Sequence, residues 1–398
     1  MVIGGIVAEY NPFHNGHALH IERTRSALGG DAAVVCCMSG DFVQRGEAAV
    51  YSKFARAEAA VRCGADLVVE LPLPWALSSA EGFARGAVGV LGGLGVVDSL
   101  SFGSECGDAG ALEAAAEALL DPALAPEIRS ELSGGLSFAA ARQRALARRS
   151  PELAALLDTP NNILGVEYIK AIFDQRLDMG VLTFRREGAA HDGAGEGNIR
   201  SAAELRTRIG AGRDVDGCMP PEAARVFARE RELGRGPVLP SALEPMLLSR
   251  LRMLPDGAYD DLPDATEGLG NRLRAAAREE PSWDGVLSAA KSKRYALSRL
   301  RRMCMCACLG IRAGMAEGTP AYARVLAANE RGREVLRMAS GRARIPIITK
   351  AAAARSMPRE IREAFELGAM ARDLYVLGCS AREERRGGSD WRTGPAML

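Results

Sequence analysis

Hydrophobic positions in the first half of the chain fall into short runs that alternate with longer amphipathic stretches. Runs that are apolar on both faces predict strands inside a sheet, and we place them at residues 2–10, 31–39, 65–72, 97–104 and 180–186. Apolar positions at helical spacing predict helices at residues 16–28, 48–63 and 79–91, with a helical insertion over about 110–150. Strands that alternate with helices indicate an α/β fold, a doubly wound parallel sheet with its ligand at the carboxyl ends of the strands.

The second half of the chain has a different pattern. From about Ser201 onward it is almost wholly helical, broken by segments rich in Gly and Pro. A chain of 398 residues is long for one core, so we expect two domains. Residues 1–200 would form the α/β domain and residues 201–380 a mainly helical C-terminal domain. Residues 381–398 are polar, and we expect them to form a flexible tail.

Charge is distributed unevenly along the chain. The net charge is only +1, but residues 291–355 contain fifteen Lys and Arg against three Glu. Such a basic stretch favours a phosphate-rich or nucleic-acid partner for the C-terminal part. The other interpretation is a solvated basic face or a surface of internal ion pairs.

Cysteine usage and hydropathy indicate a cytoplasmic protein. The apolar pattern begins at Val2 without a basic leader, so we expect no signal peptide. No apolar run reaches the roughly 20 residues of a membrane span, and we expect no membrane partner. The nine cysteines contain no C-x-x-C pair. We interpret them as apolar fillers in a reducing compartment and expect no structural metal.

Three of the four histidines, His14, His17 and His20, lie in the segment GIVAEYNPFHNGHALH. Asn11-Pro12 ends the first strand, so a helix can begin near Asn15 with His14 and His17 on one side of its first turn. Gly16 leaves the backbone open, and a helix start attracts phosphate. Surface histidines at a helix start are the simpler interpretation. The position of H-x-G-H straight after the first strand favours stabilisation of charge at an α-phosphorus instead.

Other polar residues follow the later strands. Arg45 lies in the loop after the second strand, where Arg56 is either a helix-surface charge or a ligand contact. Asp41 in the same loop is either a general base or a turn former. Gly103 ends the fourth strand, and of Asn161 and Asn162 one is expected to be a helix N-cap and the other to bind base or ribose.

Seven motifs together resemble the bacterial tRNA(Met) cytidine acetate ligase family, of nucleotidyltransferase-like Rossmann fold, in the superfamily that also contains class I aminoacyl-tRNA synthetases. They are EYNPFHNGH, MSGDFVQRGE, GADLVVELP, FGSE, NNILGVEYIKA, EGLGNRL and KSKRYALSRLRRM, and the resemblance spans roughly residues 2–309. The resemblance implies catalytic roles for His14 and His17. It also implies an ATP site formed by Val7, Ala8, Glu9, Tyr10, Asn11, Pro12, Phe13, His14, Asn15, Gly16, His17, Ala18, Leu19, His20, Gly103, Asn161, Asn162, Arg185 and Arg186.

The resemblance implies that acetate and ATP form acetyl-adenylate and diphosphate, without acetyl-CoA. The acetyl group then passes to the exocyclic amine of the wobble cytidine of elongator tRNA(Met), giving N4-acetylcytidine and AMP. We expect Mg²⁺ to accompany the triphosphate. Arg45, Ser201 and Arg206 are candidates for phosphate contacts. We expect tRNA phosphates to contact Lys291, Lys293, Arg294, Arg299, Arg301 and Arg302.

Two alternatives remain open on the sequence alone. One is a small-molecule nucleotidyltransferase, but such enzymes are usually one compact domain, and this chain has an additional basic helical half. The other is a non-catalytic RNA-binding protein with the same fold. The intact His14, Gly16 and His17 argue against such a loss of catalysis.

Overall fold

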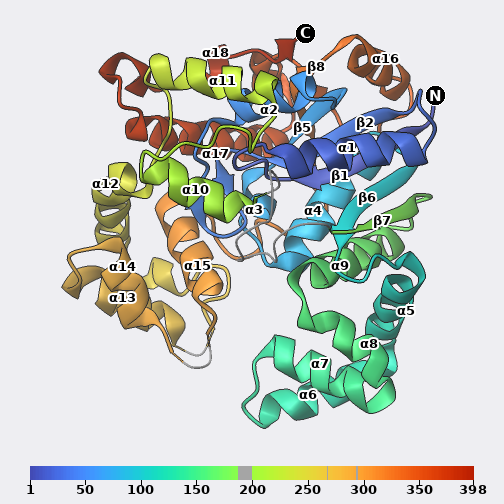
Figure 1. The fold of residues 1–398 in the computed structure, drawn as a ribbon. Coiled ribbons are helices and arrows are strands. Elements are labelled where there is room, and N and C mark those ends of the chain that lie inside the picture. Colours follow the sequence, from blue (N-terminus) through green and yellow to red (C-terminus); the bar gives the residue numbers. More distant parts are fainter. Residues whose placement is uncertain (187–199, 267, 293–294) are drawn as a thin grey trace.

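The structure, a computed structural model, describes residues 1–186, 200–266, 268–292 and 295–398 (Figure 1). Its centre is one sheet in the order β10-β8-β5-β2-β1-β6-β7, with β9 beside β8. The five expected strands are confirmed, each within two residues at either end. The strands of this sheet are β1 Ile3–Ala8, β2 Ala33–Ser39, β5 Leu67–Leu71, β6 Ser99–Ser104, β7 Gly180–Arg185, β8 Ala323–Ala328, β9 Ile347–Ile348 and β10 Ala396–Met397.

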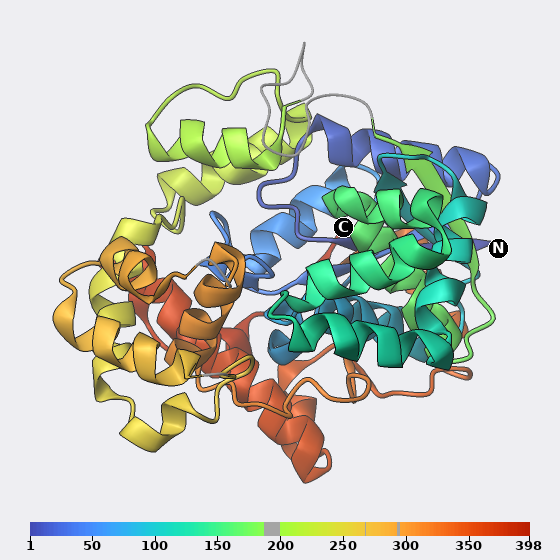
Figure 2. The same ribbon diagram turned by 90° about the horizontal axis from the view of Figure 1, so that it is seen from below.

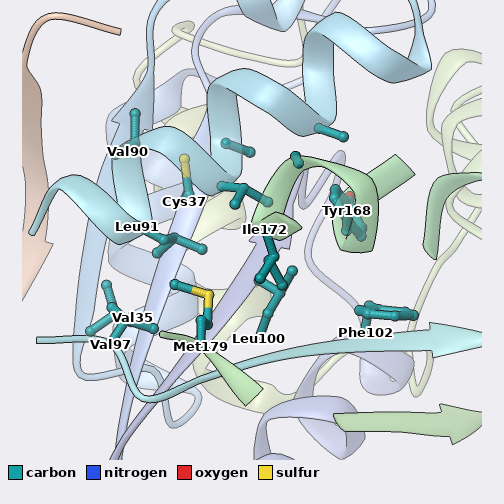
Figure 3. Packing of buried hydrophobic residues seen from close by; sticks show 14 of the residues in the cluster. Val35, Cys37, Val90, Leu91, Val97, Leu100, Phe102, Tyr168, Ile172 and Met179 are labelled. Carbon is teal, nitrogen blue, oxygen red and sulfur yellow. The ribbon is translucent and has the colours of Figure 1, made fainter. Parts of the chain in front are cut away.

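Both faces of the sheet are covered by helices, as expected for a doubly wound fold. Along β2, Val34 and Cys36 pack into the cluster that contains α1 and α2, whereas Val35 and Cys37 pack into the cluster under α4 and α9. Figure 3 shows the second cluster, with Val35, Cys37 and Leu100 of the sheet against Val90, Leu91 and Ile172 of these helices. The helices that cover the sheet are α1 Asn15–Ala27, α2 Lys53–Arg62, α4 Ala80–Gly93, α9 Pro160–Asp174 and α16 Glu330–Ala339.

Two further groups of helices lie apart from each other in both ribbon views (Figures 1 and 2). The insertion forms α5 Ala109–Leu120, η1 Pro122–Leu124, α6 Ala125–Ser133, α7 Phe138–Arg149, α8 Pro151–Ala155 and η2 Leu156–Asp158. The second group comprises α12 Pro240–Met253, η3 Asp256–Tyr259, α13 Leu269–Glu279, α14 Trp283–Ala290 and α15 Leu297–Leu309. The other elements are α3 Leu73–Ala76, α10 Ala202–Gly210, α11 Pro221–Glu232, η4 Ala351–Ser356, α17 Arg359–Tyr375, η5 Val376–Gly378, η6 Arg382–Arg385 and α18 Ser389–Arg392.

The second half of the chain departs from the wholly helical expectation. β8 lies inside the main sheet, and because it pairs antiparallel with β5, the sheet is mixed rather than purely parallel. All six residues of β8 are buried. Three of them are alanines, which favour helices in isolation, so pairing with the sheet outweighs local preference here. The division into two domains near residue 200 remains a prediction, since the structure does not describe residues 187–199.

The last residues are not a frayed tail in the structure. β10 pairs parallel with β8, and Asp390 of α18 is fully buried. This carboxylate lies within ion-pair distance of Lys53 and Arg324. One acid of this polar segment thus anchors it through a buried ion-pair cluster, while most of its other charged residues stay at the surface.

The helix expected over residues 48–63 begins later, at Lys53. The preceding residues form a small hairpin of β3 Phe42–Val43 and β4 Glu47–Ala48. In the part of the chain that the structure describes, no helix is both long and apolar enough to cross a membrane.

Candidate functional site

The turn from β1 into α1 brings two imidazoles face to face. His14 is the N-cap of α1, and the ring centroids of His14 and His17 lie 3.7 Å apart in a stacked arrangement. The Gly16 N–H donates to His14 Nδ1 over 3.1 Å, and the His14 N–H donates to His17 Nδ1 over 3.2 Å. Because each Nδ1 accepts a hydrogen bond, a neutral ring carries its proton on Nε2. Both rings thus offer an Nε2–H donor, and the expected helix start near Asn15 is confirmed.

Two adjoining cavities meet at these histidines. The smaller has a volume of about 740 Å³ and the larger about 1220 Å³, counting space open to solvent. Both are lined by His14, His17, His20, Gly103, Arg186 and Ser201, so they form one continuous site at the carboxyl end of the sheet. Clefts of this order commonly hold a drug-sized small molecule.

Most of the residues predicted for the ATP site line these cavities. They are Val7, Ala8, Glu9, Tyr10, Asn11, His14, Gly16, His17, Leu19, His20, Gly103, Asn161, Arg185 and Arg186, together with the phosphate candidates Arg45, Ser201 and Arg206. Pro12, Phe13, Asn15, Ala18 and Asn162 are not among the lining residues. The fourth histidine, His191, lies outside the described residues.

The site is rich in cationic groups, and its histidines are held neutral. Burial, followed by the nearby Arg186 and Arg206, lowers the pKa of His14 to about 4. Burial together with Arg186 and Arg23 lowers the pKa of His20 to about 4, and burial with His14 lowers the pKa of His17 well below its usual value. A bound polyanion would reverse the charge contribution to each shift. The geometry therefore suits a polyphosphate.

Two buried charged residues shape the loops around the site without lining it. Arg56 is fully buried and donates to backbone carbonyls, from Nη1 to Glu9 O and from Nη2 to Gly40 O. It is thus neither the surface charge nor the ligand contact that the sequence left open. Asp41 accepts from the Lys53 N–H over 2.8 Å and pairs with Arg372 at 3.2 Å. These contacts give Asp41 a structural role, not that of a general base.

The Asn161-Asn162 pair does not include the N-cap of α9, which is Thr159. The Glu105 carboxylate caps this helix instead, because it accepts from the backbone N–H groups of both asparagines. Asn162 Oδ1 accepts from the Glu105 and Cys106 N–H groups, over 2.9 and 3.1 Å. Asn161 Oδ1 accepts from Arg186 over 3.3 Å, so of the two it is Asn161 that faces the cavity.

The segment around Ser201 forms the opposite wall. Ser201 is the N-cap of α10, where its Oγ accepts from the Glu204 N–H over 3.2 Å. Arg206 reaches across from α10 to donate to the Asn11 carbonyl over 2.9 Å. α10 is thus tied to the turn that carries the histidines.

Several lining residues were not anticipated, namely Ile6, Arg23, Phe83, Phe102, Leu164, Tyr168, Phe184, Ala202 and Ala203. Arg23 could have been found, since His17, His20 and Arg23 repeat every three residues along one face of α1. The aromatic residues could not, because they come from four different elements.

The basic residues proposed for tRNA are only partly available. Lys291 is exposed, and Lys293 and Arg294 lie outside the described residues. Arg301 pairs with Glu47 at 2.9 Å, and Arg299 donates to Thr266 and stacks on the buried Tyr295. Arg302 lines a separate groove of about 820 Å³ between α4 and α15. Much of this stretch therefore serves contacts within the protein.

The described residues contain no group of three or more His, Cys, Asp or Glu side chains that could hold a metal ion. All nine cysteines are free, and seven are buried, in agreement with their interpretation as apolar fillers. A magnesium ion at this site would be held chiefly by phosphate oxygens and water.

The HIGH Nucleotidyl Transferase family model matches residues 1–390. A tRNA(Met) cytidine acetate ligase of Acetivibrio thermocellus is 34% identical over 98% of this chain and 98% of its own. One of Syntrophotalea carbinolica is 40% identical over 87% of this chain and 84% of its own. The structure of Thermotoga maritima TmcAL bound with alpha-thio ATP matches with a TM-score of 0.94, at 34% identity and over 100% of both chains. The apo form I of that protein matches with a TM-score of 0.96.

The doubly wound sheet and the histidine pair at its first helix define a nucleotidyltransferase of the HIGH class. Within that class, the chain belongs to the tRNA(Met) cytidine acetate ligase family.

Proposed function

We propose that this protein is an ATP-dependent ligase that acetylates the wobble cytidine of elongator tRNA(Met). It uses acetate without acetyl-CoA and releases AMP and diphosphate. The observation that carries the proposal is the stacked His14–His17 pair, which lines both of the adjoining cavities. Its tRNA substrate places the enzyme in the cytoplasm.

In the first step, an acetate oxygen attacks the α-phosphorus of ATP and diphosphate leaves. The Nε2–H groups of His14 and His17 donate to the phosphate oxygens as charge develops there. Arg45, Arg186 and Arg206 offset the charge of the departing diphosphate. A magnesium ion bound to the triphosphate would neutralise part of its charge.

In the second step, the cytidine amine attacks the acetyl carbon of acetyl-adenylate and AMP leaves. Cytosine N4 is a weak nucleophile because its lone pair is delocalised into the ring. Its orientation by the bound tRNA therefore contributes strongly to the rate. We assign phosphate contacts of the tRNA to Lys291, Lys293, Arg294, Arg299, Arg301 and Arg302.

The test uses purified protein with ATP-Mg, labelled acetate and a tRNA(Met) transcript. Label is expected in the RNA only when all components are present. Incorporation that requires acetyl-CoA would overturn the proposal. The same assay with diphosphate release as the readout, with phosphorylated metabolites in place of acetate, separates the ligase from a small-molecule nucleotidyltransferase.

A further inference from the structure

One corner of the larger cavity does not suit a polyphosphate. Glu9, Gln44, Phe83, Leu164 and Tyr168 line the larger cavity but not the smaller one, as do Arg45 and Arg206, and we refer to the first five as the Glu9 lobe. Glu9 is the only acidic residue among the described residues that line either cavity. A carboxylate repels phosphate oxygens, so its presence here indicates a different ligand group.

One hydrogen bond fixes the Glu9 side chain and another fixes its backbone. Its Oε1 accepts the Gln44 N–H over 2.8 Å, which ties the side chain to the β3–β4 hairpin. Arg56 donates to the Glu9 carbonyl, which fixes the backbone at the end of β1. A carboxylate oriented in this way is prepared to accept a hydrogen bond from a ligand.

The remaining walls of the lobe are apolar and partly aromatic. Phe83 comes from α4 and Tyr168 from α9, and both side chains are 3% exposed. Figure 3 shows Tyr168 near Phe102 of β6, whose ring centroid lies 5.5 Å from that of Tyr168. Such surfaces suit the flat faces of a nucleobase taken out of its stack.

We propose that the Glu9 lobe receives the target cytosine and that Glu9 accepts the proton of its exocyclic amine during acetyl transfer. The assignment rests on the proposed function, because it requires an acetyl group at the histidine pair. It adds the base-binding subsite and the proton acceptor. The observation is that Glu9, the one acid among the described residues lining the cavity, shares this wall with Phe83, Leu164 and Tyr168, in a cavity that the imidazoles also line.

The transfer step balances with Glu9 as the acceptor. The N4 lone pair forms a bond to the acetyl carbon, and the bond from that carbon to the phosphate oxygen breaks. AMP departs with this electron pair as a dianion and needs no proton. The proton lost from N4 passes to the Glu9 carboxylate, which releases it to water after the product leaves.

The surroundings of Glu9 are consistent with this role. Burial raises the pKa of Glu9, although the Gln44 N–H and nearby arginines oppose the rise. A carboxylate with a raised pKa is a stronger base than one in water. The titratable and charged groups facing it are His14, His17, Arg45, Arg56, Tyr168 and Arg206.

The same carboxylate would select cytosine over uracil. Cytosine presents an amine donor at position 4, whereas uracil presents a carbonyl acceptor there. A carboxylate opposite that carbonyl would leave two buried acceptors facing each other, which is unfavourable.

The decisive variant is Glu9→Gln, which keeps the size of the side chain and an oxygen for the Gln44 N–H but removes the base. Two rates are measured for each protein: acetate-dependent exchange of diphosphate into ATP without RNA, and single-turnover acetyl transfer to a tRNA(Met) transcript. We expect the ratio of transfer to exchange to fall about 100-fold or more in E9Q, the range of a lost general base. Glu22→Gln is the matched control, since Glu22 is exposed on α1 and lines neither cavity.

The pH profile and a conservative variant test the role more closely. Wild-type transfer is expected to rise with pH through the pKa of Glu9 and then level off, and E9Q is expected to lose this rise. Glu9→Asp keeps a carboxylate and should regain part of the ratio.

The outcomes are distinguishable. An unchanged ratio in E9Q, or an equal fall in both rates, would overturn the assignment of Glu9 while leaving the ligase intact. A wild-type protein without acetate-dependent exchange would overturn the proposed function and this assignment with it.

Discussion

Removal of the Asp390 carboxylate should destabilise the protein strongly, although this residue lies only eight positions from the C-terminus. Asp390 is fully buried, and its carboxylate lies 3.0 Å from Lys53 Nζ and 2.5 Å from Arg324 Nη1. Lys53 also pairs with Glu70 at 2.8 Å. Two cations are thus balanced by two carboxylates in a buried cluster that joins α18, α2, β5 and β8.

In Asp390→Ala, two buried cations would share one carboxylate. Breaking a buried pair by removing one partner costs about 3–5 kcal/mol, because the remaining charge stays desolvated. We therefore expect the free energy of unfolding to fall by about that amount. Asp390→Asn keeps the volume of the side chain but not its charge, so it should recover little of the lost free energy of unfolding.

Urea denaturation followed by circular dichroism measures this loss. The control is Glu363→Ala, which breaks an exposed pair with Arg359 and should cost at most about 0.5 kcal/mol. Burial raises the pKa of Asp390, but Lys53 and Arg324 outweigh it and the net pKa is lowered. The stabilisation is thus present above the unfolded pKa and lost as pH falls through the folded one. If D390A unfolds at the same urea concentration as the wild type, the cluster does not hold the C-terminal segment in place.

The remaining predictions concern the site. The ring of His14 should titrate at about 4 in the free protein, and NMR titration should show a higher pKa when an ATP analogue is bound. The analogue should therefore bind more tightly as pH falls between these two pKa values. An unaltered pKa would place the triphosphate elsewhere. His17→Ala should lower acetate-dependent diphosphate exchange about 100-fold or more while leaving the fold intact, and near-normal exchange would remove His17 from the mechanism. Lys291→Ala should reduce the slope of log tRNA affinity against log salt by about 0.7–0.9. Arg301→Ala breaks an internal ion pair and should also lower thermal stability. Equal slopes in the wild type and both variants would exclude Lys291 from the RNA contacts.

Local pattern accounts for much of what was anticipated in the first half of the chain. A strand such as β2 is apolar on both faces, and that alone indicates a sheet with helices on both sides. The turn at His14 is equally local, because an N-cap and its partner lie within one helical turn. The family motifs added the chemistry, since they predict which polar residues face a nucleotide.

The errors concern residues whose partners lie far away in the sequence. Arg56 was expected at a surface or a ligand, but the carbonyls it contacts belong to two loops, at Glu9 and at Gly40. One residue of the Asn161-Asn162 pair was expected to be the N-cap of α9, but the carboxylate that caps this helix belongs to Glu105, 56 positions before Asn161. β8 was missed because its six residues, three alanines and an arginine among them, have no strand signal until the edge of β5 is beside them.

By itself, the sequence determined the five parallel strands, the helices between them and the histidine-capped turn, since burial and capping preferences act over a few residues. Only the tertiary structure decided which charged side chains form ion pairs within the protein, as Arg301 and Asp390 do, and which line the site. It also decided that, of the acids in the described part of the chain, Glu9 alone lines the cavity, together with residues from α4 and α9. Hydrophobic periodicity shows that a face is buried but not which residues pack against it. The free-energy cost of burying a charged side chain depends on those residues, because they supply or withhold its partners.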